Sequence, residues 1–331
     1  MREPTCLQVG SRRVLPPSKR NKLTNEERLI TPAKLKKQWT ANKYIYLMLL
    51  PVMAFYVIFQ YGPMYGAIIA FKDFSPAHGI WHSAWVGFRW FKEFFLSYYF
   101  ARLIVNTLMI SFYSILFGFP LPIIFAMLLN EISSQLFKRS VQTVTYLPHF
   151  ISTIVVVGMM FIFTDRSGPI NDIIASVGGS RIDFMTEPGW FRPLYVGSDI
   201  WQQFGWGSII FLAALSGIDP TLYEAARMDG ASRWSQWWHI TLPGIAPTII
   251  ILLILRMGSA LTVGFQKIIL MYNPLTYDTA DVISTFVYRQ GLLEMNYSYS
   301  AAVGLFNSLA NFILLLAVNR ISRKLSETSL W

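Results

Sequence analysis

Polar side chains interrupt one apolar stretch of this sequence in a pattern that suits sugar binding. An acid, an aromatic ring and two amides lie together at Asp199, Trp201, Gln202 and Gln203, and a second aromatic ring, Trp206, follows them. Aromatic faces cover the C–H surface of a sugar ring, while amides and carboxylates bind its hydroxyl groups. We therefore predict that the first four of these residues line a substrate path. A membrane-interface belt with hydrogen bonds between helices would use the same residue types, and the sequence leaves that alternative open.

Two cations in a later apolar stretch point to the same kind of site. Arg256 and Lys267 lie in a segment where ionised side chains are costly unless they face a cavity or an acidic partner. Positive charge along a path would suit an anionic sugar such as a uronate, so both residues join the predicted path. Pairing with a neighbouring subunit explains the two charges equally well. Asn106, Ser111 and Asn307, by contrast, are predicted to bridge helices.

The sequence contains none of the common catalytic motifs. It has no G-x-x-x-x-G-K-[ST] phosphate loop, no H-E-x-x-H and no G-x-S-x-G. His78 and His82 would share a helix face, but no third ligand lies nearby in the sequence, so no metal site is predicted. Asp278 and Asp281 form an acidic pair that we interpret as turn or cap residues. The chain is predicted to have no catalytic residue and no cofactor of its own.

Within a polar stretch at residues 219–243, residues 221–238 are predicted to form two short helices. We call the whole stretch the EAA segment, after its Glu-Ala-Ala triplet. Asp219 followed by proline ends one helix and starts the next. Gly230 supplies the left-handed conformation that terminates a helix. The small alanine side chains would let the surface of another protein approach closely. The alternative interpretation is that the segment is an ordinary connection between helices with tryptophans at the membrane interface.

Composition places the chain among polytopic membrane proteins. Of its 331 residues, 53% are hydrophobic and 14% are charged, whereas soluble domains are about a quarter charged. Apolar segments long enough to cross a bilayer as helices lie at residues 44–71, 103–129, 144–163, 200–218, 242–271 and 301–318. The predicted fold class is therefore all-α, with six transmembrane helices.

The distribution of lysine and arginine predicts the orientation of these helices. Residues 1–43 contain eleven Lys or Arg against three acids, and cytoplasmic segments carry an excess of basic residues. We predict that both termini and the EAA segment lie in the cytoplasm, with a basic tail at 1–43, a membrane domain at 44–320 and a short tail at 321–331. Topology and anionic lipid then explain the net charge of +10 without nucleic acid.

The EAA segment carries a specific family motif. Its pattern of E-A-A, three residues, G, nine residues, I, one residue and L-P resembles the signature of permease subunits in binding-protein-dependent ABC importers. Every fixed position is met, by Glu224, Ala225, Ala226, Gly230, Ile240, Leu242 and Pro243. Residues 263–292, which include NPLTY and ADVISTFVYRQGL, resemble carbohydrate-uptake permeases, most closely those for oligosaccharides and uronate fragments such as alginate or pectin. The resemblance extends from about residue 43 to the C-terminus.

This resemblance implies a type I importer in the bacterial inner membrane. Its implied partners are a second permease, usually a paralogue, two copies of a cytoplasmic ATPase that holds ATP and magnesium, an extracytoplasmic solute-binding protein, an oligosaccharide and the lipid bilayer. The EAA segment would be the coupling loop that seats in the ATPase. The implied coupling positions are Glu224, Ala225, Ala226 and Gly230, with Arg227, Asp229 and Arg233 as charged contacts.

Two other kinds of transporter remain as alternatives. An ATP-independent secondary carrier would need inverted repeats and a buried acidic ion site. The predicted spans contain almost no carboxylates and show no repeat. An ABC permease for a non-sugar solute, such as an amino acid or phosphate, would share the EAA segment and differ in residues 263–292.

Overall fold

The computed structural model describes residues 42–325, with side chains to residue 323. The predicted tails therefore lie largely outside it, at 1–41 and 326–331. The described chain forms two compact units that meet after Gly66. The first consists of α3 (Lys43–Phe55), a π-helical stretch (Tyr56–Tyr61) and α4 (Gly62–Met64), and none of their residues is buried. An apolar helix exposed on all sides is typical of a segment surrounded by lipid.

The second unit, from Ala67, holds the remaining elements. A short antiparallel pair, β1 (Lys72–Asp73) and β2 (Ala84–Trp85), places Lys72 opposite Trp85 and Asp73 opposite Ala84. The helices are α5 (Gly79–His82), α6 (Arg89–Leu96), α7 (Tyr99–Gly118), α8 (Pro120–Glu131), α9 (Gln135–Tyr146), α10 (Thr153–Thr164), α11 (Pro169–Ser176), α12 (Pro188–Leu215), α13 (Pro220–Met228), α14 (Arg233–Gln236), α15 (Leu242–Gly258), α16 (Phe265–Met271), α17 (Tyr277–Ala280), α18 (Ile283–Tyr288) and α19 (Tyr297–Leu325).

Helices long and apolar enough to cross a membrane account for the predicted spans. Five segments qualify alone: Lys43–Phe71, Tyr99–Glu131, Thr153–Ser176, Arg233–Gly258 and Tyr297–Arg323. Helices α12 and α13 qualify jointly, with a bend of 77° between them. Each predicted span thus has a counterpart, and the all-α, six-helix membrane fold is confirmed.

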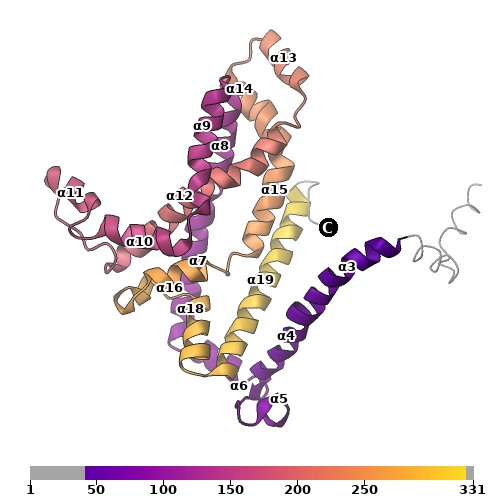
Figure 1. Cartoon of the computed structure of the whole chain (residues 1–331), viewed down its shortest axis with the longest axis vertical. Helices are drawn as coiled ribbons and strands as arrows, with labels where there is room; N and C mark the ends of the chain where they lie inside the picture. The colour runs from indigo at the N-terminus through magenta and orange to yellow at the C-terminus, as the bar shows by residue number, and fades with distance from the viewer. Residues whose placement is uncertain (1–41, 326–331) are drawn as a thin grey trace, which may run out of the picture. The chain divides into compact units, whose positions relative to one another are not determined.

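Helix α12 contributes residues to two apolar clusters. Near its start, Phe191 and Tyr195 pack with Ile110 of α7 and Ile268 of α16. Near its end, Phe211 packs with residues of α8 and α15. Figure 1 shows α12 crossing beside α8 and α9, with α15 and α19 running side by side. The central position of α12 lets residues on several neighbouring helices face its side chains.

A glycine allows the end of α9 to approach α12. A Cβ atom at Gly205 would lie 2.2 Å from the carbonyl oxygen of Thr145, a distance that real Cβ atoms essentially never show. Gly205 is buried at this crossing. A larger residue would push the two backbones apart, so the close contact of α9 with α12 depends on glycine.

A buried ion-pair network joins the connection before α19 to α7. The carboxylate of Asp281, whose side chain is fully buried, lies 2.6 Å from Arg289 Nη2 and 3.7 Å from Arg102 Nη2. Thr285 Oγ1 donates a hydrogen bond to it at 2.9 Å, and Asp278 pairs with Arg102 at 3.2 Å. Both acids thus form ion pairs, and they lie at the first turn and at the C-cap position of α17.

The third span differs from prediction because it is interrupted. The sequence predicts one helix over 144–163, but α9 ends at Tyr146 and α10 begins at Thr153. Pro148 lacks the N–H that a continuous helix needs, and Leu147–Phe150 forms a 3₁₀ turn instead. The Ser152 side chain then accepts a hydrogen bond from the Val155 N–H and caps α10.

The fourth and fifth spans also have different ends from those predicted. Helix α12 already begins at Pro188, where proline suits the first turn, so Asp199 lies within the helix and not at its outer end. Helix α15 ends at Gly258, and residues 259–264 are not helical. The side chain of Asn311 accepts a hydrogen bond from the Leu261 N–H at 2.9 Å and replaces a helical partner. Lys267 consequently lies on the separate helix α16.

Candidate functional site

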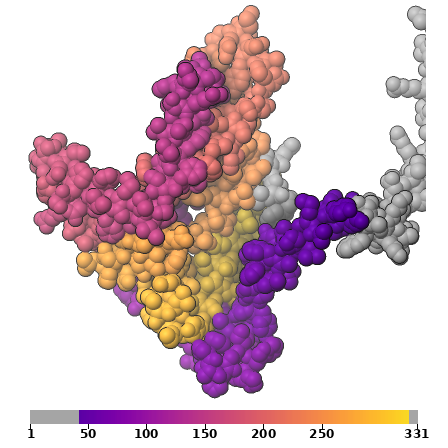
Figure 2. Space-filling model, viewed as in Figure 1, coloured from indigo at the N-terminus to yellow at the C-terminus, as the bar shows by residue number. Residues whose placement is uncertain are grey.

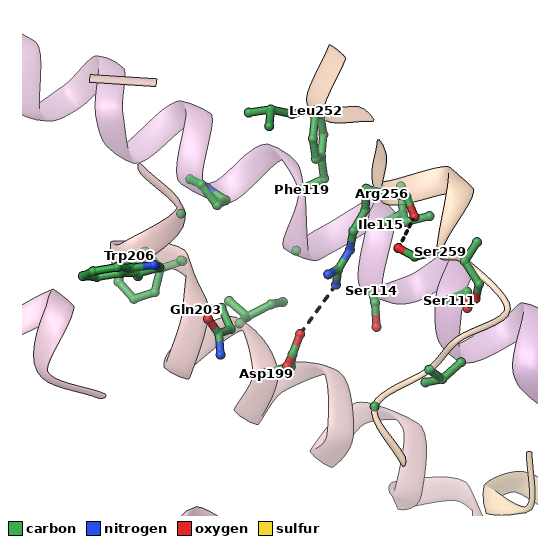
Figure 3. A pocket seen from close by; sticks show the side chains of 18 of the residues that line it. Ser111, Ser114, Ile115, Phe119, Asp199, Gln203, Trp206, Leu252, Arg256 and Ser259 are labelled. Carbon is green, nitrogen blue, oxygen red and sulfur yellow. Dashed lines mark hydrogen bonds and ion pairs between the residues drawn. The ribbon is translucent and has the colours of Figure 1, made fainter. Parts of the chain in front are cut away.

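A cavity of about 500 Å³ opens between α7, α8, α12, α15 and the non-helical link 259–264. Its polar lining side chains include Ser111, Ser114, Asp199, Gln203, Arg256 and Ser259. Aromatic side chains, among them Trp206 and Phe119, line other parts of it (Figure 3). Hydroxyls, an amide, two opposite charges and aromatic faces in one cavity are the groups that a polar, ring-shaped solute requires.

The carboxylate of Asp199 lies between two cations. Arg256 Nη2 is 3.8 Å from one carboxylate oxygen and Lys267 Nζ is 3.9 Å from the other. Lys267 is 5% exposed, and its Nζ has no hydrogen-bond partner among the described residues. The ring of Tyr195 lies 5.5 Å from that Nζ. A buried ammonium group needs a counter-charge, so Asp199 serves as the anion that keeps Lys267 in place.

Tyr195 also fixes the link that closes one side of the cavity. Its hydroxyl accepts a hydrogen bond from the Gly264 N–H at 3.1 Å. A Cβ atom at Gly264 would lie 2.7 Å from the same hydroxyl, so only glycine fits there without a shift. Ser111 Oγ donates to the carbonyl of Ala260 and holds the link from the side of α7. Ser111, predicted to bridge helices, therefore joins α7 to the non-helical link and lines the cavity as well.

The predicted path residues divide between two faces of α12 and two neighbouring helices. Asp199, Gln203 and Arg256 line the cavity. Trp201 is exposed on another face of α12, and Lys267 lies behind Asp199. Gln202 is buried and donates a hydrogen bond to the Ile151 carbonyl oxygen at 2.9 Å. This hydrogen bond satisfies a backbone acceptor at the break between α9 and α10.

Trp206 is a cavity residue that the predicted path omits. Its indole stacks on the His149 ring with centroids 4.4 Å apart and planes within 2°, while His149 Nδ1 lies 2.9 Å from Gln203 Oε1. Positions three and four apart share a helix face, so counting from Asp199 to Gln203 and Trp206 would have found it. The same counting places Trp201 on a different face.

The EAA segment forms the first predicted short helix as α13, but the second, α14, continues through a π-helical stretch (Trp237–Thr241) directly into α15. Asp219 Oδ1 accepts from the Thr221 N–H at 2.9 Å and caps α13, and this hydrogen bond lowers the pKa of the Asp219 carboxyl. Gly230 has φ +77°, the left-handed conformation expected after a helix. Ser232 caps α14 through the Ser235 N–H. Helix α15 then begins at Leu242.

Helix α13 is the most exposed part of the EAA segment. It contains no buried residue, and Glu224, Ala225, Arg227, Asp229 and Gly230 are exposed. Ala226 is half-buried. Figures 1 and 2 show α13 at one end of the second unit, beyond the ends of α8 and α15. A capped helix with small and charged residues on an open surface is suited to docking against another protein.

A contact with α8 holds the second half of the EAA segment. Glu131, the last residue of α8, accepts a hydrogen bond from Trp237 Nε1 at 3.0 Å and pairs with Arg233 Nη1 at 3.3 Å. Tyr223 and Thr241 join the two halves of the segment through their hydroxyls at 3.0 Å. Arg233, predicted as a contact to a partner, thus has a partner within the chain. Because Pro122 of α8 lines the cavity, α8 connects the EAA segment with the cavity.

Comparison with protein families finds one that covers most of the chain. Residues 118–327 match the family described as binding-protein-dependent transport system inner membrane component. Protein LplB of Bacillus subtilis (strain 168) is 48% identical over 291 residues, which are 88% of this chain and 92% of LplB. The polygalacturonan/rhamnogalacturonan transport system permease protein YteP of the same organism is 44% identical, over 88% of this chain and 91% of YteP.

Solved structures with the same fold include a bacterial ABC transporter involved in the import of the acidic polysaccharide alginate. A chain of that transporter is 44% identical to this one and superimposes with a TM-score of 0.82, over 88% of this chain and 99% of its own length. In the complex with a periplasmic protein that holds an alginate pentasaccharide, the TM-score is 0.83, over 90% and 100% of the two chains.

Proposed function

This chain belongs to the binding-protein-dependent transport system inner membrane components, and we propose that its central cavity forms part of the path for an acidic oligosaccharide. It is a permease subunit of an ABC importer and not an enzyme, because ATP hydrolysis belongs to a separate subunit of such systems. Membership of this family argues against an ATP-independent carrier. The single observation that supports the path is the cavity beside Asp199, which combines hydroxyls, charges and an aromatic face.

The partners of the chain follow from the family. ABC importer permeases of this kind pair with a second permease and with ATPase subunits, and the solved relative binds a periplasmic protein. We propose two ATPase copies, with ATP and magnesium bound to them, and an acidic oligosaccharide as cargo. The names of YteP and of the alginate transporter support that class of cargo.

The membrane orientation that we propose places both termini and the EAA segment in the cytoplasm. Glu131 and the EAA segment are in contact and so lie at one end of the second unit. The Arg102–Asp278 ion pair links the start of α7 to the connection before α19. Arg102 therefore lies at the opposite end of the α7–α8 span from Glu131. The excess of basic residues at 1–43 supports a cytoplasmic N-terminus.

Coupling in this proposal depends on rigid-body movement. Helix α13 seats on the ATPase through Glu224, Ala225, Ala226 and Gly230, with Arg227 and Asp229 at the edge of the contact. When the ATPases close, α13 moves, and the contact of Glu131 with the EAA segment transmits that movement to α8. Since α8 and α15 line the cavity, its shape changes with the nucleotide state.

Two glycines provide a matched test of this coupling role. Gly230 and Gly178 have φ values of +77° and +86°, and a Cβ atom at either would meet nothing within 4 Å. The Gly230→Asp and Gly178→Asp variants therefore carry similar backbone strain, but only the first lies in the EAA segment. In liposomes containing the complete transporter, we expect Gly230→Asp to lower uptake and binding-protein-stimulated ATPase activity roughly tenfold, which corresponds to about 1.4 kcal/mol.

The Gly178→Asp variant should retain both activities. If Gly230→Asp assembles normally and transports as well as Gly178→Asp, the proposed role of α13 is wrong. Assembly is checked by co-purification of the ATPase, so that a loss of the complex is distinguished from a loss of coupling within it.

A further inference from the structure

We propose that Arg256 binds a carboxylate of the transported sugar as the sugar passes through the cavity, and that Asp199 and Lys267 position it to do so. This inference rests on the proposed function and makes it more specific. It assigns the ligand class at one residue, namely a uronate carboxylate.

Arg256 presents its guanidinium to the cavity and shares the Asp199 carboxylate with Lys267, without a direct hydrogen bond to it. It lies in the last turn of α15, its side chain is 51% exposed, and it points toward Asp199 across the cavity (Figure 3). The separation of 3.8 Å from the carboxylate is too long for a direct hydrogen bond. The planar N–H groups are therefore available to a ligand that can reach them.

Lys267 determines how the Asp199 carboxylate is shared between Lys267 and Arg256. Its ammonium is buried, has no hydrogen-bond acceptor among the described residues, and has Asp199 as its nearby anion. Solvent can stabilise the half-exposed Arg256 but reaches Lys267 poorly, so Asp199 is needed more by Lys267. Two positive charges and one negative charge leave one excess positive charge, which Arg256 carries into the cavity.

A uronate has the groups that this cavity can bind. A carboxylate accepts two parallel hydrogen bonds from an arginine fork, a geometry that a lysine ammonium does not reproduce. The face of a sugar ring can lie on Trp206, whose other face is covered by His149. Gln203, Ser114 and Ser259 provide partners for hydroxyls. A neutral sugar has no carboxylate to accept hydrogen bonds from the Arg256 guanidinium, so the cavity would discriminate against neutral sugars.

The test compares two oligosaccharides that differ only at C6 of each ring, which is a carboxylate in one and a neutral hydroxymethyl group in the other. Radiolabelled α-1,4-trigalacturonate and its carboxyl-reduced counterpart are bound to the complete transporter in nanodiscs, without the binding protein and at low and high salt. We expect the wild type to bind trigalacturonate at least tenfold more tightly at low salt, since hydrogen bonds to charged groups typically contribute that much. Salt should reduce the difference.

Substitutions at Arg256 separate charge recognition from cavity shape. Arg256→Gln should abolish the preference and its salt dependence while leaving binding of the carboxyl-reduced trimer within about twofold. Arg256→Lys should retain part of the preference, because the charge stays but the fork is lost. Arg320→Gln, which removes an exposed positive charge near the C-terminal end of α19, is the matched control and should resemble the wild type.

Four results would overturn the inference. Unchanged binding of trigalacturonate by Arg256→Gln would show that Arg256 does not contact the carboxylate. Equal weakening of both trimers would assign Arg256 to the shape of the cavity. A wild-type transporter that binds the carboxyl-reduced trimer equally well removes the carboxylate site but preserves an oligosaccharide path, whereas one that binds neither trimer contradicts the path itself.

Discussion

The EAA segment and the cavity differ in how their residues are brought together. In the EAA segment, the caps at Asp219 and Ser232 and the turn at Gly230 involve residues at most a few positions apart. At the cavity, Asp199 and Arg256 come from α12 and α15 and the buried Lys267 behind them from α16, far apart in sequence. The first region is exposed and built from local contacts; the second is buried in part and depends on the packing of several helices.

This difference predicts different responses to substitution. A change on α13 should affect docking to a partner with little effect on folding, because α13 has no buried residue. A change in the Asp199 cluster should affect both folding and ligand binding. The three predictions below test that contrast, beginning with the largest effect.

Asp199→Asn should have the largest effect, because it leaves the buried Lys267 ammonium without an anion. We expect a loss of about 3 kcal/mol in unfolding free energy, the low end for removing one partner of a buried ion pair. Thermal unfolding of the purified transporter measures the loss. Adding Lys267→Gln should restore much of it, and a double variant no more stable than Asp199→Asn would contradict the pairing.

The matched control for this prediction is an exposed ion pair of the same chain. Asp172 and Arg181 pair at 2.7 Å, with side chains 59% and 39% exposed. Surface pairs contribute about 0–1 kcal/mol. Asp172→Asn should therefore shift the unfolding temperature far less than Asp199→Asn.

Two tryptophans on α12 test the assignment of the cavity face. Trp206 lines the cavity and Trp201 does not, although the two are equally exposed at 41%. Trp206→Ala should raise the KM for oligosaccharide uptake roughly fivefold, since an aromatic contact contributes about 1 kcal/mol. Trp201→Ala should change KM less than about twofold. Equal effects in liposome uptake assays would mean that the face is assigned incorrectly.

Glu131→Gln should have the smallest effect, because the residue acts through an exposed contact. The amide can still accept from Trp237 but loses the charge that pairs with Arg233. We expect roughly a doubling of ATP hydrolysed per solute transported, which corresponds to about 0.4 kcal/mol and lies within the range for surface pairs. Glu294→Gln, at an exposed residue that bonds to Gln290, is the control. An unchanged ratio would remove Glu131 from the coupling route.

The sequence predicts most of the fold because the determining signals are local. Apolar length predicts the spans, and Asp219 with Pro220 predicts the start of α13. Pro148 marks the break in the third span, but proline alone does not distinguish a kinked helix from two helices. The separation of those helices also depends on Gln202, which binds the Ile151 carbonyl from a distant segment.

The candidate site could be predicted only in part. Asp199, Gln203 and Arg256 are recognisable as polar residues in apolar surroundings. The burial of Lys267 could not be inferred, because it depends on the end of α15 at Gly258 and on contacts of the link with Tyr195 and Asn311. The internal partner of Arg233 likewise requires that α8 end beside α14, which its sequence spacing does not reveal.

The non-helical link 259–264 lies between the helix that carries Arg256 and the helix that carries Lys267, so the two helices can move independently. Arg256 precedes it on α15, which packs with α19 and α12, whereas Lys267 follows it on α16, which packs with α10 and α12. A tilt of α15 relative to α12 therefore changes the distance from Arg256 to Asp199 while Lys267 keeps its anion. The electrostatic attraction that a passing solute experiences would then vary through the transport cycle, strong in one conformation and weak in the next, which is what release of a tightly held cargo demands.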